Sequence, residues 1–444
     1  MRRKKQLLVG ILAVILLMLS GCFGVSLEEL YSLPEPAVEY LQLQSLIDAE
    51  IAGGCEYAAP IGGSYRQSVQ LIDLDNDDTD EAFAFLRDAD QNLRICVYCA
   101  TNGVYSQTLV IEGHGTSISS VEYADLTGSG VSELLVSWQI GSGLRMLCVY
   151  SMEGWGGNQL LTVDCTEFTV CDMDVSGNVE LLAIRFDAAE GGVVDMFSFS
   201  GNGEAILSSA LFSTGVRSIE RIRIGTLAED MPVLYIESKY EEGWLVTDLF
   251  VSRRGRLKNL SQDMNSGISN TLRRDNIYCF DVDDDNYIEI PVPVSLYPQS
   301  DGASHAAITW YGYDSAGIRT LDVSTYHNQS DGWYLLLKES WRENLSVRRE
   351  EGASGERTVI LSTADPQTGE IRDFLAIYTL TGENRRERAQ LHGRFLLRDE
   401  STTLYAAKIL SPSDDPNDPN AFTAEDVKAN FRLIYSEWMT SLTN

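Results

Sequence analysis

A nine-residue acidic motif recurs along this chain, and its residue types suit the binding of a divalent cation. Each copy opens with aspartate and closes with glutamate eight positions later, with oxygen-bearing side chains at most of the alternate positions between them. The clear copies are loop 1 (residues 73–81), loop 2 (125–133), loop 3 (172–180) and loop 5 (281–289). Ca²⁺ takes roughly six to eight oxygen ligands in a flexible geometry. The motif therefore predicts a repeated loop that is built to hold a cation.

Loops 1 and 5 are the strongest candidates because each has four carboxylates in nine residues. Without a cation these groups repel one another, so binding one relieves the repulsion and fixes the loop. The predicted Ca²⁺ ligands are Asp73, Asp75, Asp77 and Glu81 in loop 1 and Asp281, Asp283, Asp285 and Glu289 in loop 5. The alternative is a solvated acidic turn held by hydrogen bonds to its own backbone.

The remaining copies are weaker. Loop 3 offers a reduced ligand set, made up of Asp172, Asp174, Ser176 and Glu180. Loop 2 keeps only two carboxylates, Asp125 and Glu133, and is expected to hold a water or nothing. A worn fourth copy at residues 225–233 cannot form the site, because Gly225, Leu227, Glu229 and Val233 stand at its ligand positions; that loop would be held by packing alone. Metal binding is thus predicted to have a structural role and to weaken from loops 1 and 5 to loop 3 and then to loop 2.

The spacing of the motif indicates the fold. Successive copies begin 47 to 56 residues apart, each between apolar runs typical of β-strands. A repeat of this length holds the four short strands of a propeller blade, and closing the ring removes exposed sheet edges. We expect a mainly β chain, a closed β-propeller of about five to seven blades with short flanking N- and C-terminal helices. Residues 65–323 hold the acidic repeats, and residues 324–410 are degenerate blades or a separate β-rich region. The rival is a β-sandwich joined to an α+β domain beginning near residue 324.

Two helices are expected to flank the repeats. Residues 37–54 carry an apolar stripe that includes Ile47 and end at a glycine pair. Residues 411–444 begin with a linker rich in proline and aspartate. Thr423 then reads as the N-cap of an amphipathic helix, with Asp426 three positions on. The apolar face of this predicted helix consists of Val427, Phe431, Ile434, Trp438 and Leu442.

The acidic loop followed by a strand resembles the FG-GAP/VCBS type of β-propeller repeat over residues 68–295. That resemblance implies Ca²⁺ in the blade loops of a bacterial surface protein. The chain departs from the pattern in two ways. It has no Phe-Gly…Gly-Ala-Pro string, and Asp78 and Asn286 replace the usual glycine at the sixth loop position. Asp and Asn tolerate a positive φ better than other non-glycine residues, so the turn is retained.

The N-terminus predicts export and anchoring. Four basic residues precede thirteen almost purely apolar ones, too few to span a bilayer, and Leu19-Ser20-Gly21-Cys22 resembles the lipobox of bacterial lipoproteins. We expect a signal peptide at residues 1–21, lipidation of Cys22, a tether at 22–36 and a place on the extracytoplasmic face of the cell membrane. Removing residues 1–21 moves the formal charge from −31 to −35, which disfavours nucleic acid as a partner.

Seven cysteines follow Cys22, an odd number that cannot pair completely. Cys96 and Cys99 are spaced like a redox pair, yet in a strand this spacing puts their side chains on opposite faces. Most of the cysteines therefore read as small buried apolar residues. A disulfide between Cys165 and Cys171 remains open.

The predicted function is that of a binding module for a surface glycan or protein. Trp155 and Trp244 are the candidate ligand contacts, although each could equally pack over its own blade. One alternative is a polysaccharide-acting enzyme, a lyase or glycosidase, with its carboxylates hidden among the 65 acidic residues. The other is a solute-binding lipoprotein, which would require alternating βα units that this sequence lacks. No familiar catalytic motif surrounds the four histidines, so enzyme activity stays uncertain.

Overall fold

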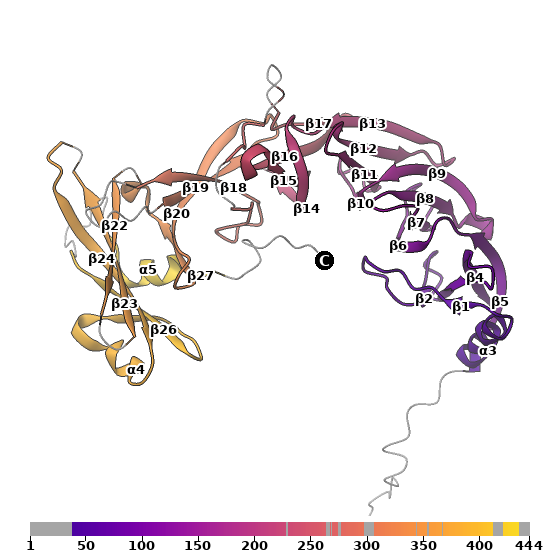
Figure 1. Ribbon diagram of the computed structural model, residues 1–444, viewed down its shortest axis with the longest axis horizontal. Helices are drawn as coiled ribbons and strands as arrows, with labels where there is room; N and C mark the ends of the chain where they lie inside the picture. Colours follow the sequence, from indigo (N-terminus) through magenta and orange to yellow (C-terminus); the bar gives the residue numbers. More distant parts are fainter. Residues whose placement is uncertain are drawn as a thin grey trace, which may run out of the picture.

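Six antiparallel β-sheets follow one another along the chain (Figure 1). The computed structural model describes residues 38–227, 230–262, 267, 269–273, 277–296, 306–342, 344–352, 355–365, 367–411 and 421–434. The predicted signal peptide, Cys22, the tether and linker residues 412–420 lie outside this set. Each sheet has four or five strands, which confirms a mainly β fold with a sheet number inside the predicted range of five to seven.

The sheets are numbered 1 to 6 in chain order. Sheet 1 contains β1 (Glu56–Tyr57), β2 (Val69–Ile72), β3 (Glu81–Arg87), β4 (Leu93–Thr101) and β5 (Val104–Glu112). Sheet 2 contains β6 (Ser117–Ala124), β7 (Glu133–Gln139), β8 (Arg145–Ser151) and β9 (Asn158–Cys165). Sheet 3 contains β10 (Glu167–Cys171), β11 (Glu180–Asp187), β12 (Gly191–Phe199) and β13 (Ala205–Leu211).

Sheets 4 to 6 complete the series. Sheet 4 contains β14 (Val216–Leu227), β15 (Met231–Tyr240), β16 (Leu245–Arg253) and β17 (Arg256–Asn259). Sheet 5 contains β18 (Ile290–Ser295), β19 (Ala306–Tyr313), β20 (Arg319–Asn328), β21 (Trp333–Leu337) and β27 (Phe431–Leu433). Sheet 6 contains β22 (Leu345–Glu351), β23 (Glu356–Ala364), β24 (Ile371–Thr381), β25 (Phe395–Asp399) and β26 (Thr403–Ile409).

Helices are few and short. The described α-helices are α3 (Val38–Ala52), α4 (Arg385–Arg388) and α5 (Ala424–Asn430). Single 3₁₀ turns are η1 (Glu153–Trp155), η3 (Glu241–Gly243), η4 (Glu339–Trp341) and η5 (Leu391–Gly393). Among the helices of the described residues, none is both long and apolar enough to cross a bilayer.

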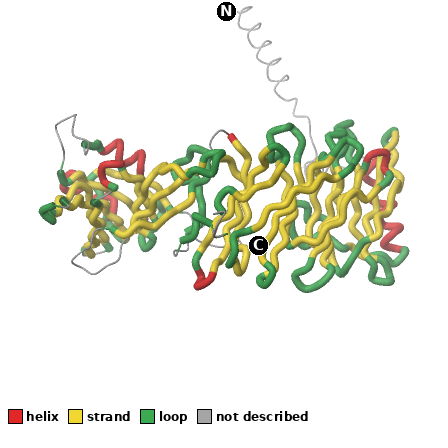
Figure 2. Tube along the Cα trace, turned by 90° about the horizontal axis from the view of Figure 1, so that it is seen from above, coloured by secondary structure: helices red, strands yellow, loops and turns green. Residues whose placement is uncertain are grey.

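The sheets are arranged along an arc. Their first strands, such as β6, β10 and β14, lie on its concave side, and their last strands, such as β5, β9 and β13, lie on its convex side (Figure 1). Seen edge-on, the strands cross the width of the arc between loops at its two rims (Figure 2). Because each sheet is an antiparallel meander, the first and third connections of a sheet share one rim and the second connection lies at the other. This topology places the acidic loops on one rim, called here the acidic rim.

Apolar side chains fill the space between neighbouring sheets. A cluster that includes Phe83 and Trp138 joins sheets 1 and 2, and one that includes Leu135 and Leu181 joins sheets 2 and 3. The same alternation continues along the arc, so each strand contributes one face to the core before it and the other face to the core after it. The stack is therefore held together mainly by contacts between sequential neighbours.

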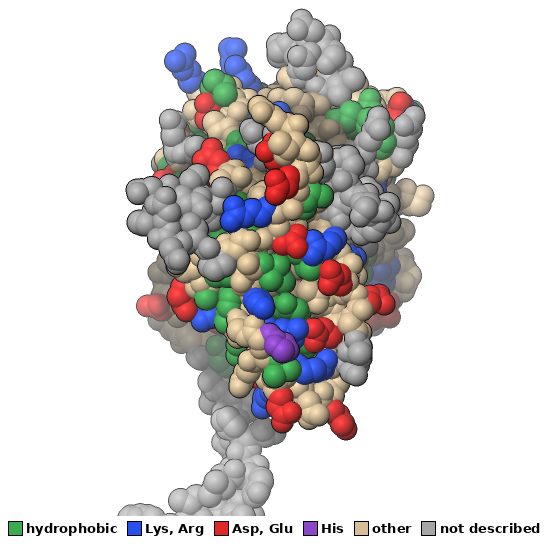
Figure 3. Space-filling view, turned by 90° about the vertical axis from the view of Figure 1, so that its left-hand side faces the viewer, with side chains coloured by type: hydrophobic (Ala, Val, Ile, Leu, Met, Phe, Trp, Pro, Cys, Tyr) green, Lys and Arg blue, Asp and Glu red, His purple; other side chains and the backbone are tan. Residues whose placement is uncertain are grey.

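The six sheets form a propeller-like arrangement of six blades, inside the predicted range, and the arc that they follow is open between sheets 1 and 6 (Figure 1). Sheets 1 and 6 lie at its two ends (Figure 1). At the first end, Leu43 and Ile47 of α3 cover the outward face of sheet 1 through Ala84 and Tyr98. At the other end, Ala389, which follows α4, packs on the outward face of sheet 6. Charged side chains of both signs are interspersed over this end of the molecule (Figure 3). Each outward face is thus covered by its own chain, as in the terminal units of solenoids, which leaves little apolar surface to pair the ends.

The C-terminal helix is shorter than predicted. Thr423 and Asp426 form the expected capping box, but α5 ends at Asn430. Phe431 then inserts its ring beside Trp333 and Tyr405, at centroid distances of 5.6 and 5.5 Å, while β27 pairs with β21. Ring packing and strand pairing together override the helical periodicity. The predicted face residues Trp438 and Leu442 lie outside the described residues.

The worn fourth repeat also differs from expectation. Instead of a nine-residue loop held by packing, β14 and β15 extend toward each other and pair as far as Leu227 and Met231. Only residues 228–230 connect them. Without ligand side chains there is no wide loop, and the backbone satisfies its hydrogen bonds by lengthening the strands.

The seven described cysteines are free. As predicted, Cys96 and Cys99 point to opposite faces of β4: Cys96 packs toward α3 and Cys99 toward sheet 2. Burial raises the pKa of each of these thiols to about 11. Both therefore stay protonated and inert at neutral pH, in keeping with a packing role.

Candidate metal centre

The four acidic loops share one register. In each, the residue before the motif pairs with the closing glutamate, so eight residues bridge two adjacent antiparallel strands. The pairs are Ile72 with Glu81, Ala124 with Glu133, Cys171 with Glu180 and Phe280 with Glu289. The acidic loops, which are regularly spaced in the sequence, thus occupy equivalent positions in the fold.

The opening aspartate shapes the loop through the backbone. In loop 1 the amides of Asp77 and Asp78 donate to Asp73 Oδ1 and Oδ2, each at 3.1 Å. In loop 5 the amides of Asp285 and Asn286 donate to Asp281 at 3.1 and 3.0 Å. Loops 2 and 3 repeat these bonds with distances of 2.9 to 3.0 Å. The first carboxylate therefore folds the chain into a turn that brings the later carboxylates together.

Positions four and six of every loop have a positive φ. In loop 5 these are Asp284 and Asn286, with φ of 68° and 75°. Loop 2 uses glycine at both positions, and loop 3 uses Val175 (φ 60°) and Gly177. Asp, Asn and Gly accept this conformation at low cost, whereas a β-branched valine does not. The substitutions at position six that looked like departures from the repeat pattern therefore preserve its geometry.

The closing glutamate is buried in every loop. Its carboxylate accepts a hydrogen bond from the backbone amide of position two, at 3.1 Å in loop 1 and 3.0 Å in loop 5. Burial, with the neighbouring aspartates adding to it, raises the pKa of Glu81 to about 7 and that of Glu289 to about 9. A buried carboxylate among other carboxylates is unfavourable, because it has lost the water that would solvate its negative charge. A bound cation stabilises it by supplying a compensating positive charge.

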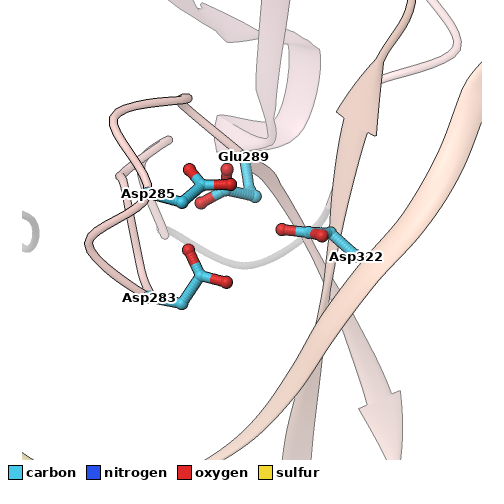
Figure 4. Close-up of side chains that lie close together, drawn as sticks. All are labelled: Asp283, Asp285, Glu289 and Asp322. Carbon is cyan, nitrogen blue, oxygen red and sulfur yellow. The ribbon is translucent and has the colours of Figure 1, made fainter. Parts of the chain in front are cut away.

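Loop 5 gathers the largest carboxylate group. Oxygens of Asp283, Asp285, Glu289 and Asp322 all lie within 4.8 Å of one another (Figure 4). Asp322 comes from β20 and points toward the loop from a neighbouring strand (Figure 4). Burial, together with the nearby acids, raises the pKa of Asp283 to about 6 and also raises that of Asp322. One carboxylate oxygen of Asp283 is buried without any hydrogen-bond partner among the described residues.

Loops 1 and 3 form smaller groups. Loop 1 brings together Asp73, Asp75 and Glu81, and loop 3 brings together Asp172, Asp174 and Glu180. Asp77, a predicted ligand, accepts the amide of Thr79 at 2.8 Å, and Ser176 accepts that of Asn178 at 3.3 Å. The predicted ligand Asp281 holds the turn of loop 5 as described above. Loop 2 presents no group of three such side chains, in line with its two carboxylates.

The donor set fits Ca²⁺. Every member of these groups is a carboxylate, a hard oxygen donor, and none is a thiolate or imidazole. The unpartnered Asp283 oxygen lies among the other carboxylates of the group and is available as a cation ligand. Asp322 could not be found from the motif, because it lies on a strand well beyond the loop. The acidic clusters can therefore bind a metal ion such as Ca²⁺.

The two candidate tryptophans lie on opposite rims. Trp155, in the third connection of sheet 2, shares the acidic rim, whereas Trp244, in the second connection of sheet 4, lies at the other rim. Trp155 is half-buried against the core between sheets 1 and 2. Trp155 thus has the packing role that the sequence left open. Because the two tryptophans lie on opposite rims, one ligand surface cannot include both rings.

A groove runs along the concave side of sheets 1 to 3. Its volume is about 350 Å³, and its lining comes from β6, β10 and residues 61–64. Arg145 and Glu167 form an ion pair in it at 2.7 Å, and burial raises the pKa of Glu122. The rest of the lining is mixed, with hydroxyl groups from Ser64, Ser119, Ser120 and Thr169 beside the apolar Ile61, Val121, Phe168 and Val170. Sequence analysis missed this groove because its residues come from three separate repeats.

Comparison with known proteins adds only distant similarity in fold. No protein-family model matches the chain, and no curated protein matches it. Among solved structures, the Bacillus licheniformis rhamnogalacturonan lyase PL11 is 12% identical, with a TM-score of 0.28 over 71% of this chain and 80% of the other. Saccharomyces cerevisiae Sqt1 is 9% identical, with a TM-score of 0.27 over 77% of this chain and 95% of the other. Similarity at this level carries no argument about function. The functional argument therefore depends on the residues of the site.

Proposed function

We propose that this protein is a Ca²⁺-stabilised binding module, anchored by lipid to the extracytoplasmic face of a cell membrane, that holds a surface glycan or protein. The observation that carries the proposal is the concave groove, which is lined by the first strands of sheets 2 and 3, β6 and β10, and by residues 61–64 between β1 and β2. Ligand sites occur preferentially in concave surfaces with a few convergent polar groups. The groove offers hydroxyls, an ion pair and a half-buried carboxyl, which suit a ligand rich in hydroxyl or amide groups.

The repeats are inferred to be of the FG-GAP/VCBS type, with Ca²⁺ as their structural cofactor. In this role Asp283, Asp285, Glu289 and Asp322 would hold the ion at loop 5, and smaller sets would do so at loops 1 and 3. The ion would neutralise buried carboxylates and join loop 5 to β20. In this role the ion neutralises charge and links two parts of the fold, and it takes part in no reaction. Such a structural ion is in keeping with a binding role for the protein.

Glycan arrays and surface-protein capture with the full-length protein test this function. A matched pair of variants locates the site: Thr169→Arg obstructs the groove, and Gln107→Arg adds the same charge on the convex strand β5. We expect capture to be lost only with Thr169→Arg. Equal capture by both variants would exclude the groove. Shortened products in the captured glycan would identify a lyase or glycosidase instead.

The anchor is tested separately. Lipid labelling of the wild type and of Cys22→Ala should show label only in the wild type, because Cys22 is the last residue of the lipobox-like sequence. Retention of the label in Cys22→Ala would exclude lipidation at this residue. The binding function could still stand in that case, since the groove lies far along the chain from residue 22.

A further inference from the structure

The hairpin between β16 and β17 carries a basic cluster that the acidic composition of the chain does not lead one to expect. Four of the six residues from 253 to 258 are cationic, and the cluster is defined here as Arg253, Arg254, Arg256 and Lys258. The whole chain has 34 basic and 65 acidic residues. Such a concentration of positive charge is therefore local to this hairpin.

Within the described part of the chain, the basic cluster has no ion-pair partner. Elsewhere, arginines find carboxylates, as in Arg185 with Asp195, Arg217 with Glu241 and Arg394 with Glu356. None of the four side chains of the basic cluster makes an ion pair or side-chain hydrogen bond with a described residue. With acids in nearly twofold excess, the lack of a pair here is informative.

The hairpin geometry makes this arrangement costly. Arg253 and Arg256 stand directly opposite each other as a cross-strand pair, and Lys258 lies on the same face two pairs further along. Like charges directly opposite each other destabilise a strand pair. Arg254 sits at the turn with a φ of 53° and is exposed. Since Arg256 and Lys258 are exposed as well, a bound anion could reach them and relieve the repulsion.

A pocket lies beside the hairpin. It has a volume of about 880 Å³, and its lining includes the whole basic cluster together with Ser252, Met231 and Ser315. No acidic side chain lines it among the described residues. Ser315 belongs to the β19–β20 connection, so the pocket lies between sheets 4 and 5. Three guanidinium groups around one hollow can give bidentate hydrogen bonds to an oxyanion.

The surroundings decide what kind of anion fits. The pocket lies on the acidic rim. The β16–β17 hairpin is the third connection of sheet 4, and the β19–β20 connection lies beside loop 5, because loop 5 leads into β18 and the antiparallel β19 ends at the same rim. A nucleic acid or an anionic membrane would have to approach the carboxylates of loops 1, 3 and 5 at the same time, which repel it. A single compact anionic group on an otherwise uncharged molecule meets only the local positive charge.

We propose that the pocket between the β16–β17 hairpin and sheet 5 binds a sulfate or phosphate ester carried by a surface glycan. This rests on the proposed glycan-binding function and adds a second contact to the concave groove. The arginines would bind the ester oxygens, and the saccharide would extend along the rim between sheets 4 and 5.

The test uses full-length protein in detergent and compares a sulfated oligosaccharide, its desulfated counterpart and inorganic sulfate by calorimetry. The variant Arg253→Gln/Arg256→Gln/Lys258→Gln removes three charges from the pocket. Its matched control, Arg217→Gln/Arg372→Gln/Arg386→Gln, removes three charges from exposed positions elsewhere. We expect the sulfated oligosaccharide to bind the wild type and control within twofold of each other and the pocket variant at least tenfold more weakly. The affinity should fall as salt is raised, and the desulfated sugar should bind at least tenfold more weakly than the sulfated one.

Other outcomes overturn the inference. Equal affinity of the pocket variant and the control, or no binding of the sulfated sugar to the wild type, would exclude the pocket. Binding to vesicles that contain phosphatidylglycerol, but not to the sulfated sugar, would assign it to a membrane instead. Capture of a neutral glycan or of a surface protein by both variants alike, with no difference between them for the sulfated sugar, would leave the proposed function standing and refute this inference. Thermal melting of both variants in the same buffer shows whether each is folded.

Discussion

Sheets 4 and 5 differ in the source of the positive charge that compensates a buried glutamate. In sheet 4, Glu237 accepts hydrogen bonds from Arg273 at 3.0 Å and from the amide of Cys279 at 2.7 Å, and Arg221 lies 3.8 Å away. In sheet 5, Glu289 is equally buried but has only carboxylates as charged neighbours in its cluster. The first sheet carries its counter-charge in its own sequence, whereas the second must take it from solution.

This difference between sheets 4 and 5 indicates under what condition a repeat can lose its acidic loop. Sheet 4 lacks the acidic loop and joins its first two strands by a short connection. Its internal ion network also fixes residues 269–273 and 277–279 across its strands. Its stability should not depend on a metal ion. Sheet 5 keeps the loop and with it a dependence on cations. Four changes test this contrast, and they are arranged by the size of the expected effect.

Arg273→Ala should cause the largest loss. It leaves Glu237 buried without its main partner, and breaking a buried pair in this way costs about 3–5 kcal/mol in the free energy of unfolding. Arg217→Ala, which breaks the exposed pair with Glu241, should cost about 0–1 kcal/mol. Urea denaturation measures both, and Ca²⁺ should change neither difference. A loss of stability that Ca²⁺ restored would contradict the division between the two sheets.

Ca²⁺ should stabilise the protein through sheet 5. One site with free ion at about 100 times its Kd contributes about 2.7 kcal/mol to the free energy of unfolding. Chelation should therefore lower the melting temperature, and Asp283→Ala with Asp75→Ala should reduce the response to the small part that loop 3 contributes. Asp322→Asn should remove most of the loop 5 part, because it takes away the one carboxylate supplied by β20. Asp314→Asn, in the β19–β20 connection outside the cluster, is the control. A melting curve indifferent to chelator would leave only solvated turns.

His327 should make sheet 5 sensitive to acid. Its ring stacks on Tyr334 at 5.1 Å and bonds to Thr325, and burial lowers the pKa of the imidazole to about 3. The unfolded chain binds a proton near pH 6.5 and the folded one does not, so stability is complete above pH 6.5 and falls as the pH drops toward 3. At pH 5 the loss is about 1–2 kcal/mol, allowing for residual solvent contact. His327→Gln should flatten the stability profile between pH 6.5 and 5 relative to the wild type; an unchanged slope would assign it to other groups.

Val175→Gly should give the smallest effect, a gain. Val175 occupies the positive-φ position four of loop 3, is exposed, and is the only β-branched residue at positions four and six of the four loops. Removing the strain should add about 1 kcal/mol or less, because glycine also increases the entropy of the unfolded chain. Val131→Gly in loop 2, at a position without positive φ in the structure, should not be stabilising. Chemical denaturation of the two variants decides the point.

Much of this architecture could be predicted from the loops. Asp73 and Glu81, and their counterparts in loops 2 and 3, mark the end of one strand and the start of the next, and loop 5 marks the start of β18, so their spacing located a strand boundary in four sheets. Local chemistry is sufficient there because Asp73 bonds to the backbone only four and five residues ahead. The capping box at Thr423 was predictable for the same reason.

Features that depend on distant contacts could not be predicted. Asp322 joins the loop 5 cluster only because β20 folds back beside it, and no periodicity marks this aspartate. Phe431 ends its helix to reach Trp333, a residue almost one hundred positions earlier. The concave groove and the basic pocket each draw on separate repeats. Closure was predicted from the cost of exposed edges, yet α3 covers the outward face of sheet 1 without it.

The capped, open arc also determines how the molecule responds to mechanical force. Each inner sheet is packed between two neighbours, but each end sheet has only one, and α3 is attached to sheet 1 through a single helix face. In a linear stack, stability is approximately the sum of intrinsic and nearest-neighbour terms, so loss can begin at an end and spread. Pulling on the two ends of the chain should therefore release α3 and then sheets one at a time, giving a series of extension steps rather than one rupture.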